Sequence, residues 1–324
     1  MMELPKLTVK DKKILKLLDR DARESNSQLA KKARLSKNIV NYQIHRLEKE
    51  GIIKRYITLV DYSKLGYMLF RVYLDLYEKD LQKEQELVQY LVKNKKTGLV
   101  ARTSGDWDII FTLYVKSLEE FNEEWYKFTD KFKEIIKSYN NNLVTREFTY
   151  PRNYLLPEKG DERLFWDRGA SDTQIEIDEK DQILLKELLE NARAPVNEMA
   201  RKIGLGSMAI IYRLRQMEKK NIILGYRAEL DFNKLGYESY KVNLELEDTK
   251  VIKEILAYCK VSPGVVSVIR PISDNVDLEF DVEVTDFSDF SKLMDGMKKQ
   301  FPGAIRDYMY IKILEQLKQV HLPL

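Results

Sequence analysis

The 324-residue sequence is poor in the residues that most metal sites and catalytic centres require. Its single cysteine, Cys259, excludes an internal disulfide and any zinc site built from several cysteines, and we expect this side chain to be buried as a small hydrophobe. The two histidines are too few for a histidine-rich metal site; we expect His321, in the C-terminal tail, to be solvated or packed. No Ser-His-Asp set and no phosphate-binding glycine loop occurs. The sequence therefore argues against an enzyme and predicts no catalytic residue, metal or cofactor.

Long apolar runs are also lacking. No stretch approaches the ~18 apolar residues of a membrane span, and the start, MMELPKLTVKDKK, has no apolar signal-peptide core. We therefore expect a cytoplasmic protein without a membrane partner. Lys and Arg number 55 against 52 Asp and Glu, a net charge of +3, which excludes a histone-like polycation. With 33% charged and 44% hydrophobic residues, the chain is typical of folded globular domains.

The chain repeats itself at an offset of 170 residues. Residues 7–67 align without a gap on residues 177–237, with about a third of the positions identical. The identities include Ala22-Arg23 on Ala192-Arg193, and the run 64–67 on 234–237. This period is longer than the roughly 20–50 residues of solenoid repeats, so each repeat is a pair of domains.

Between the repeats, Pro151, Pro157, Gly160 and Gly169 stand among many charges, which is typical of a linker. We expect the apolar cluster 164–166 within it to dock on a neighbouring domain rather than to bind a partner. The sequence predicts five segments: a winged helix-turn-helix domain (1–60), a ferredoxin-like domain (61–150), a linker (151–174), a second winged helix-turn-helix domain (175–230) and a second ferredoxin-like domain (231–324).

Each repeat opens with three short helices. In the first repeat they are expected over residues 10–20, 25–33 and from 37 onward, with Thr8 and Ser36 as N-caps and Gly51 at the end of the third. A β-rich wing follows over residues 52–57. In the second repeat Asp178 takes the first cap and Gly204 lies in the tight turn. Two helices joined by a short turn are the layout of a helix-turn-helix.

The third helix has two unlike faces at about 100° per residue. Its apolar side chains, Val40, Ile44 and Leu47, share one face and are expected to pack. The opposite face carries groups that hydrogen-bond base edges or phosphates. Residues 1–56 also hold 15 Lys or Arg against 7 Asp or Glu, with Lys31 and Lys32 among the expected phosphate contacts. The predicted DNA contacts are Ser36, Lys37, Asn38, Asn41, Tyr42, His45, Arg46, Lys54 and Arg55 in the first repeat, and Ser207, Tyr212, Arg213 and Arg215 in the second.

The second helix-turn-helix gives a weaker signal. Residues 171–226 hold 9 basic and 9 acidic residues, and the outer face of the third helix carries Met208 and Ile211 beside Tyr212 and Arg215. The two apolar side chains could contact thymine methyl groups, or the face could be partly packed against protein.

After each wing the pattern is β-α-β-β-α-β. The expected elements are 68–77, 83–93, 98–103, 108–115, 118–136 and 143–148, then 238–246, 250–259, 265–270, 277–284, 287–301 and 305–314. This is the split βαβ pattern of a ferredoxin-like sandwich, whose open sheet face we expect a partner sheet to cover. The fold class is therefore α+β: two winged helix-turn-helix domains alternating with two βαββαβ ferredoxin-like, RAM-like domains.

These motifs make the chain resemble the Lrp/AsnC family of transcription regulators, with the family's two-domain unit written twice. The resemblance implies a DNA-binding regulator whose two repeats form a pseudo-dimer within one chain, with further association of chains. It also implies an amino-acid effector at the turn Gly105-Asp106-Trp107-Asp108, which matches the family's Gly-Asp-aromatic-Asp motif; a plain hairpin turn is the alternative. The corresponding segment 273–277 departs from this motif. Gln43 stands where the family usually has Arg, which Arg213 keeps.

Two other functions remain open from the sequence. The siroheme decarboxylases resemble this architecture, but their catalysis uses histidines and arginines of the sandwich domain, whereas His45 lies on the third helix. The third possibility is an architectural protein that binds duplex DNA with little sequence preference. The polar face of the third helix favours a sequence-specific regulator over both.

Overall fold

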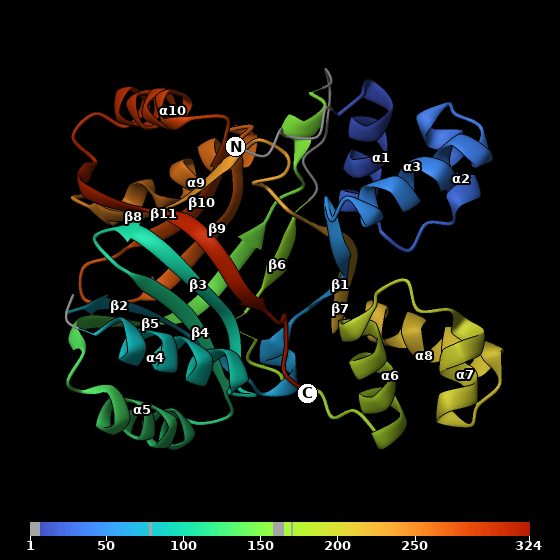
Figure 1. Cartoon of the computed structure of the whole chain (residues 1–324), viewed down its shortest axis with the longest axis horizontal. Helices are drawn as coiled ribbons and strands as arrows, with labels where there is room; N and C mark the ends of the chain where they lie inside the picture. The colour runs from blue at the N-terminus through green and yellow to red at the C-terminus, as the bar shows by residue number, and fades with distance from the viewer. Residues whose placement is uncertain (1–6, 78–79, 158–164, 170) are drawn as a thin grey trace.

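The computed structural model describes residues 7–77, 80–157, 165–169 and 171–324. Two helix-turn-helix units lie on one side of the molecule and a β-barrel with four outer helices lies on the other, with the ribbon of β1 and β7 between them (Figure 1). The α+β class with two helix-turn-helix units is confirmed.

The helices of the two units begin and end close to where the sequence places them. The first unit contains α1 (Val9–Arg20), α2 (Asn26–Ala33) and α3 (Lys37–Lys49). The second contains α6 (Glu179–Glu190), α7 (Val196–Ile203) and α8 (Ser207–Lys219). Thr8 forms a capping box with Asp11, and the Ser36 hydroxyl accepts a hydrogen bond from the Ile39 amide, so both predicted N-caps are present. Gly51 and Gly204 adopt left-handed backbone at φ 67° and 70°, as helix-ending glycines do.

The strands that follow α3 and α8 pair with each other. β1 (Ile53–Val60) and β7 (Ile223–Leu230) form an antiparallel ribbon, in which Thr58 lies opposite Tyr226 and Tyr56 opposite Ala228. The segment expected to begin a wing in each repeat therefore joins the two repeats. Because each strand satisfies the backbone groups of the other, neither repeat can complete this element alone.

Contacts across the ribbon come in reciprocal pairs. The Ala22 amide donates to the Tyr226 carbonyl, and the Ala192 amide to the Tyr56 carbonyl, over 2.9 and 3.0 Å. The guanidinium of Arg23 lies 5.2 Å from the ring centre of Tyr226, and that of Arg193 lies 5.1 Å from Tyr56. A further reciprocal pair is formed by the backbone amides of Asp61 and Asp231. Each donates a 2.9 Å hydrogen bond to a carbonyl of the other repeat. The repeats are thus related by a pseudo-twofold axis through the ribbon.

The remaining strands and helices follow the predicted order. The first half supplies β2 (Met68–Leu76), α4 (Leu81–Lys93), β3 (Thr97–Gly105), β4 (Ile109–Val115), α5 (Leu118–Phe132) and β5 (Ile136–Thr149). The second supplies β8 (Glu238–Leu246), α9 (Ile252–Val261), β9 (Val265–Ile272), β10 (Leu278–Val284), α10 (Phe287–Gln300) and β11 (Ile305–Gln319). Cys259 is buried in the core between α9 and its sheet.

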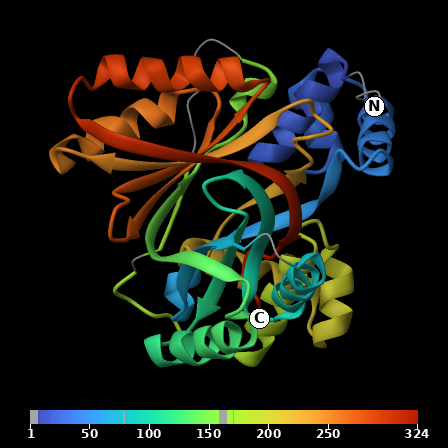
Figure 2. The same ribbon diagram turned by 60° about the vertical axis from the view of Figure 1, so that its left-hand side comes forward.

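Two strands are much longer than predicted, and they join the halves. β5 pairs with β2 over its first part and with β9 of the other half over its last part; β11 pairs with both β8 and β3. Among the described residues, nine strands make one sheet, and the β2–β5 pairing closes eight of them into a barrel. Figure 2 shows β11, in red, crossing from one half to the other. The helix expected to reach residue 136 ends at Phe132, and β5 begins at Ile136.

The two helix-free sheet faces line the inside of this barrel, and that interior is polar. Side chains of β2 point alternately to its two faces: Phe70 and Val72 point toward the outer helices, and Arg71 points into the barrel. There Arg71 forms a buried ion pair with Glu279 of the other half. Lys241 and Asp281 form a second pair in the interior. The sheets therefore meet through charged groups as well as apolar ones.

The linker docks on the chain itself. β6 (Trp166–Arg168) pairs with the end of β5, and the Arg227 guanidinium lies 4.8 Å from the ring centre of Trp166. Phe165 contacts Phe148 at a ring separation of 6.2 Å. Leu164, the third member of the predicted apolar cluster, lies outside the described residues. Within the described ranges, every helix is too short or too polar to span a bilayer.

An ionic clamp ties the first helix-turn-helix unit to the barrel. Asp19 of α1 accepts hydrogen bonds from Arg227 of β7 over 2.6 Å and from Arg152 over 3.0 Å, and Arg152 also bonds Glu283 of β10 over 2.7 Å. Burial disfavours the Asp19 carboxylate, but the two arginines outweigh burial and hold its pKa below the ordinary value of 3.8. We call these four residues the Asp19 clamp.

Asp19→Asn is expected to lower the free energy of unfolding at neutral pH by about 3–5 kcal/mol, because it leaves two buried arginines without their shared carboxylate. Since the folded-state pKa of Asp19 is depressed, its stabilisation is fully present above the ordinary pKa of 3.8 and is lost as pH falls through the lower folded-state pKa. Chemical unfolding of both proteins at several pH values measures this. Lys292→Gln, at an exposed lysine of α10, is the control with unchanged stability; a pH-independent difference between wild type and Asp19→Asn would contradict the assignment.

Candidate nucleic-acid interface

Helix α3 has the two faces that its sequence predicts. Val40, Ile44 and Leu47 are buried against the other helices of the unit. Lys37, Asn38, Asn41, Tyr42 and His45 are exposed on the other face, and Tyr42 keeps 67% of its surface accessible. An exposed large aromatic beside amides and a lysine, on the second helix of a helix-turn-helix, is a surface suited to the major groove.

Several polar residues of α3 have partners within the protein. The Asn41 carbonyl oxygen accepts a 2.7 Å hydrogen bond from Asn26 of α2, which orients the Asn41 amide. Arg46 pairs with Asp11 over 2.7 Å and with Glu50 over 3.2 Å. The predicted phosphate contact of Arg46 would require it to leave or share two carboxylates, so its first role is to hold α3 against α1.

The predicted basic contacts differ in their surroundings. Lys31 and Lys37 are exposed near the two ends of the turn, while Lys32 pairs with Glu24. Lys54 lies 3.8 Å from Asp231. Arg55 bonds Glu229 of β7 and the carbonyl of Gln319 at the end of β11, which places its guanidinium between the ribbon and the barrel. A phosphate contact by Arg55 stays a prediction.

The second unit presents a less polar face. On α8, Met208 and Tyr212 keep 76% and 64% of their surfaces accessible, and Arg215 is exposed. The Ser207 hydroxyl bonds Asn197, over 2.9 Å. The sequence left it open whether Met208 and Ile211 contact thymine methyl groups or pack against protein. Met208 is exposed, whereas Ile211 is half-buried.

Arg213, a predicted DNA contact, has partners within the protein. It pairs with Asp178 and Asp181 at the start of α6, each over 2.7 Å. Asp181 corresponds to Asp11 of the first repeat, which Arg46 binds instead. In the first repeat, Arg46 therefore makes the contact between the first and third helices that Arg213 makes in the second. That Gln43 weakens a phosphate contact of the first repeat stays a prediction.

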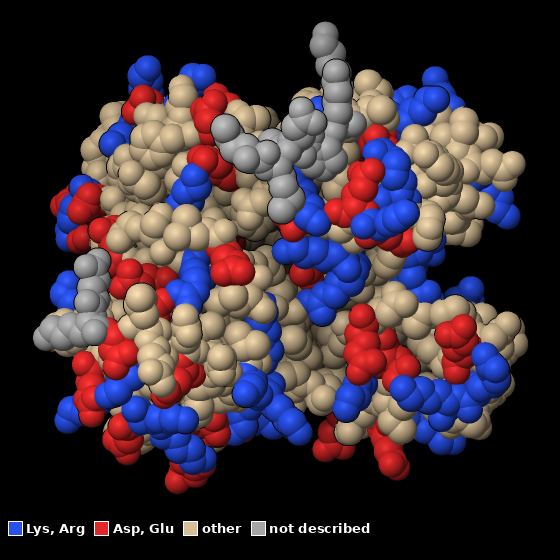
Figure 3. Space-filling model, viewed as in Figure 1, with Lys and Arg blue, Asp and Glu red and all other residues tan. Residues whose placement is uncertain are grey.

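Figure 3 shows Lys and Arg side chains over both helix-turn-helix units, on the right of the view, with Asp and Glu between them and a hollow separating the two units. The mixture of signs agrees with the balanced charge of the second unit. The positive excess of residues 1–56 places the stronger electrostatic attraction for DNA on the first unit.

The turn expected to bind an effector has structural partners. A Cβ at Gly105, whose φ is +118°, would lie 2.8 Å from the Tyr310 carbonyl, so glycine allows β11 to approach β3. Asp108 accepts a hydrogen bond from the Leu76 amide over 2.8 Å, and Asp277 does the same for Leu246 in the other half, over 2.7 Å. Asp106 is exposed. In both halves an aspartate of this turn therefore binds the backbone of a neighbouring strand. Effector binding by Gly105, Asp106 and Asp108 stays a prediction.

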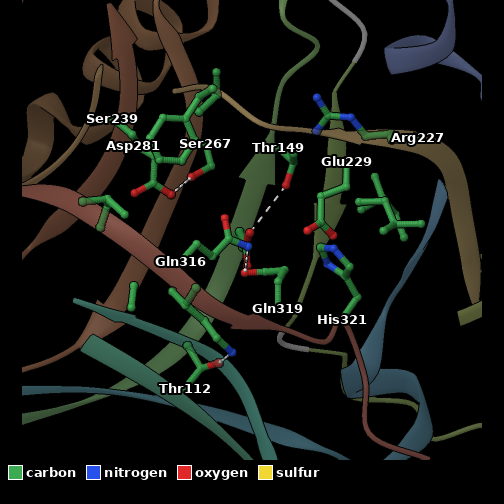
Figure 4. Close-up of a pocket in the computed structure, with 18 of the residues that line it drawn as sticks. Thr112, Thr149, Arg227, Glu229, Ser239, Ser267, Asp281, Gln316, Gln319 and His321 are labelled. Atoms are coloured by element: carbon green, nitrogen blue, oxygen red, sulfur yellow. Dashed lines mark hydrogen bonds between the residues drawn. The ribbon is translucent and has the colours of Figure 1, made fainter. Parts of the chain in front are cut away.

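A cavity of about 210 Å³ lies between the ribbon and the mouth of the barrel. Figure 4 shows Arg227, Glu229 and His321 on one side of it and Ser267 and Asp281 on the other. His321, expected to be solvated or packed, contributes its ring to this cavity, and burial together with nearby Arg168 lowers its pKa well below the ordinary value. The sequence signal for this site was weak, because its residues come from the ribbon, the barrel, the linker and the C-terminal tail.

Family models match both helix-turn-helix units. Residues 7–54 match a winged helix-turn-helix DNA-binding model, and residues 177–218 match an AsnC-type helix-turn-helix domain. The proline dehydrogenase transcriptional activator of Rhodobacter capsulatus is 32% identical over 147 residues, which span 44% of this chain and 94% of that protein. The HTH-type transcriptional regulator FL11 of Pyrococcus horikoshii is 29% identical over 112 residues, 35% of this chain and 73% of that protein.

Among solved structures, the siroheme decarboxylase NirDL has a similar fold, with a TM-score of 0.64, 15% identity and coverage of 97% of this chain and 94% of that one. At this identity the likeness concerns the fold alone. The sequence matches, by contrast, are to regulators, and they extend over nearly the whole length of one of them. The chain belongs to the Lrp/AsnC family of DNA-binding transcription regulators and contains the family's two-domain unit twice.

Proposed function

We propose that this chain binds duplex operators as an intrachain pseudo-dimer and recognises two unequal half-sites. The observation that carries the proposal is the exposed polar face of α3, held at a fixed position relative to α8 by the ribbon. A twofold-related pair of recognition helices matches a dyad operator. Because the two helices carry different side chains, the two half-sites should differ in sequence and in strength.

Base and phosphate contacts can be separated by mutation. Asn38→Ala or Asn41→Ala is expected to weaken binding to the preferred operator by about 1–3 kcal/mol while binding to unrelated DNA changes little, because the amides would contact base edges. Lys37→Ala should weaken binding to all sequences alike. It should also reduce the slope of the logarithm of the binding constant against the logarithm of the salt concentration by about 1. Gel shifts over a salt series, with selected and unrelated duplexes, measure both. Identical behaviour of the two kinds of variant would contradict these contact assignments.

Tyr42 and Tyr212 occupy equivalent, similarly exposed positions and give a matched pair. Tyr42→Ala should reduce operator affinity more than Tyr212→Ala, because the first unit has the greater positive charge and the more polar recognition helix. Footprinting should show strong protection of one half-site that Tyr42→Ala removes. Equal effects of the two variants, with two equivalent half-sites, would contradict the inequality that we propose.

Two further proposals concern ligands and assembly. An amino-acid effector at the Gly105–Asp108 turn is supported by the motif at that turn, and association of chains beyond the pseudo-dimer by the family resemblance. Sedimentation of the purified chain with and without leucine tests both, because an effector that stabilises an assembly changes its mass distribution. A single unchanged monomer under all conditions would contradict them.

We also propose that the chain has no siroheme decarboxylase activity. The proposal is supported by the sequence matches, which are to transcription regulators, whereas the likeness to NirDL at 15% identity concerns the fold alone. Anaerobic incubation with siroheme should leave its mass unchanged, and loss of carboxyl groups would contradict this proposal. The gel-shift comparison of selected and unrelated duplexes distinguishes a sequence-specific regulator from a non-specific architectural protein, which would bind both kinds of duplex alike.

A further inference from the structure

The central cavity contains buried polar atoms that the described protein leaves without partners. Arg168 is 93% buried; its Nη2 bonds Glu147 over 2.8 Å, but its Nε and Nη1 have no hydrogen-bond partner among the described residues. In the same part of the structure, Arg71 Nε and both ring nitrogens of His321 also lack partners. All three side chains line the cavity. Buried polar groups without a partner destabilise the fold, so a site with several of them is expected to bind a ligand that supplies partners.

The carboxylates around the cavity, unlike these donors, are already paired. Glu147 binds Arg168, Asp281 binds Lys241 and Ser267, and Glu283 binds Arg152. Glu229 is bound by Arg55. Among the described residues that line the cavity, the buried polar atoms without a partner are therefore arginine nitrogens and the two nitrogens of one imidazole. They suit a ligand rich in acceptor oxygens, and they offer no free carboxylate to an ammonium group.

We propose that this cavity binds a small organic acid, whose carboxylate is held by Arg168 and His321. An eight-stranded barrel is wide enough to hold one small ligand, and the volume suits a molecule of roughly eight to ten non-hydrogen atoms. The site is distinct from the Gly105–Asp108 turn, none of whose residues lines the cavity. Its ligand class also differs from an amino acid, because the ammonium of an amino acid would meet arginines and carboxylates that are already paired.

Occupation of the cavity is coupled to the first helix-turn-helix unit through the Asp19 clamp. Arg152 and Arg227 line the cavity and also hold Asp19 of α1. A carboxylate that enters the site competes for these guanidinium groups and shifts the position of α1 relative to the barrel. The second unit lacks this connection: Leu189 corresponds to Asp19, and Ile57 corresponds to Arg227. The ligand should therefore act on the first half-site more than on the second.

The test uses the full chain and the dicarboxylate succinate as the probe. Isothermal titration should show one succinate per chain, whereas the neutral analogue succinamide and the amino acid leucine should bind at least tenfold more weakly at this site. His321→Phe keeps an aromatic ring, slightly larger than imidazole, and removes two nitrogens that have no partner in the described structure. It should still fold, as its melting transition will show, and lose succinate affinity by about tenfold or more.

One control variant and one further test variant complete the experiment. His45→Phe makes the same change on α3 and should keep full succinate binding. Arg168→Lys keeps a cation for Glu147 but removes the free Nε and Nη1 atoms, so it should lose succinate binding like His321→Phe. Absence of succinate binding to the wild-type chain, or unchanged binding to both His321→Phe and Arg168→Lys, would overturn the proposal.

The coupling to DNA rests on the proposed function and is measured separately. In footprinting, succinate should change protection of the first half-site in wild type and in the Lys292→Gln control, but not in His321→Phe. Succinate binding by titration without any DNA binding would refute the proposed function and leave the ligand site standing. DNA binding that succinate alters equally in wild type and His321→Phe would overturn the coupling through this cavity.

Discussion

The β1–β7 ribbon is the constraint on which the rest of the structure depends. It satisfies the backbone of two strands that neither repeat can pair alone, and the reciprocal amides of Ala22 and Ala192 fix each helix-turn-helix unit against the strand of the other. The spacing of the two recognition helices is therefore set within one chain and does not depend on protein concentration.

Covalent duplication allows the two halves to diverge while the contacts between them are kept. Several residues that are identical in both repeats, such as Ala22-Arg23 and Tyr56 with their counterparts, make the contacts that cross the pseudo-twofold axis. The residues that differ lie on the DNA-facing surface, where Asn38 stands opposite Met208, and at the clamp, where Asp19 stands opposite Leu189. The contacts between the halves are thus kept, while differences at the recognition helices and at the clamp allow the halves to have separate roles.

The helices and most strands could be predicted because local signals determine them. Thr8 and Ser36 cap helices, and the 3.6-residue period separates the buried Val40 and Ile44 from the exposed Asn41. The long ends of β5 and β11 could not be predicted, because their partners lie in the other half and leave no local period. The cavity escaped prediction for the same reason: Arg168 and His321 lie more than 150 residues apart in the sequence and meet only when the barrel closes.

The polar interior of the barrel favours pairing between the two unlike halves. Register places Lys241 opposite Asp281 in the second half, while the equivalent Arg71 lies opposite Thr112 in the first. The acid that neutralises Arg71 is Glu279, from the second half, and its equivalent in the first half is Ile110. Two first halves would bury two arginines without a carboxylate, which costs several kcal/mol per ion. The charges inside the barrel therefore make the two repeats complementary, and the same arrangement leaves arginine donors over for a carboxylate ligand.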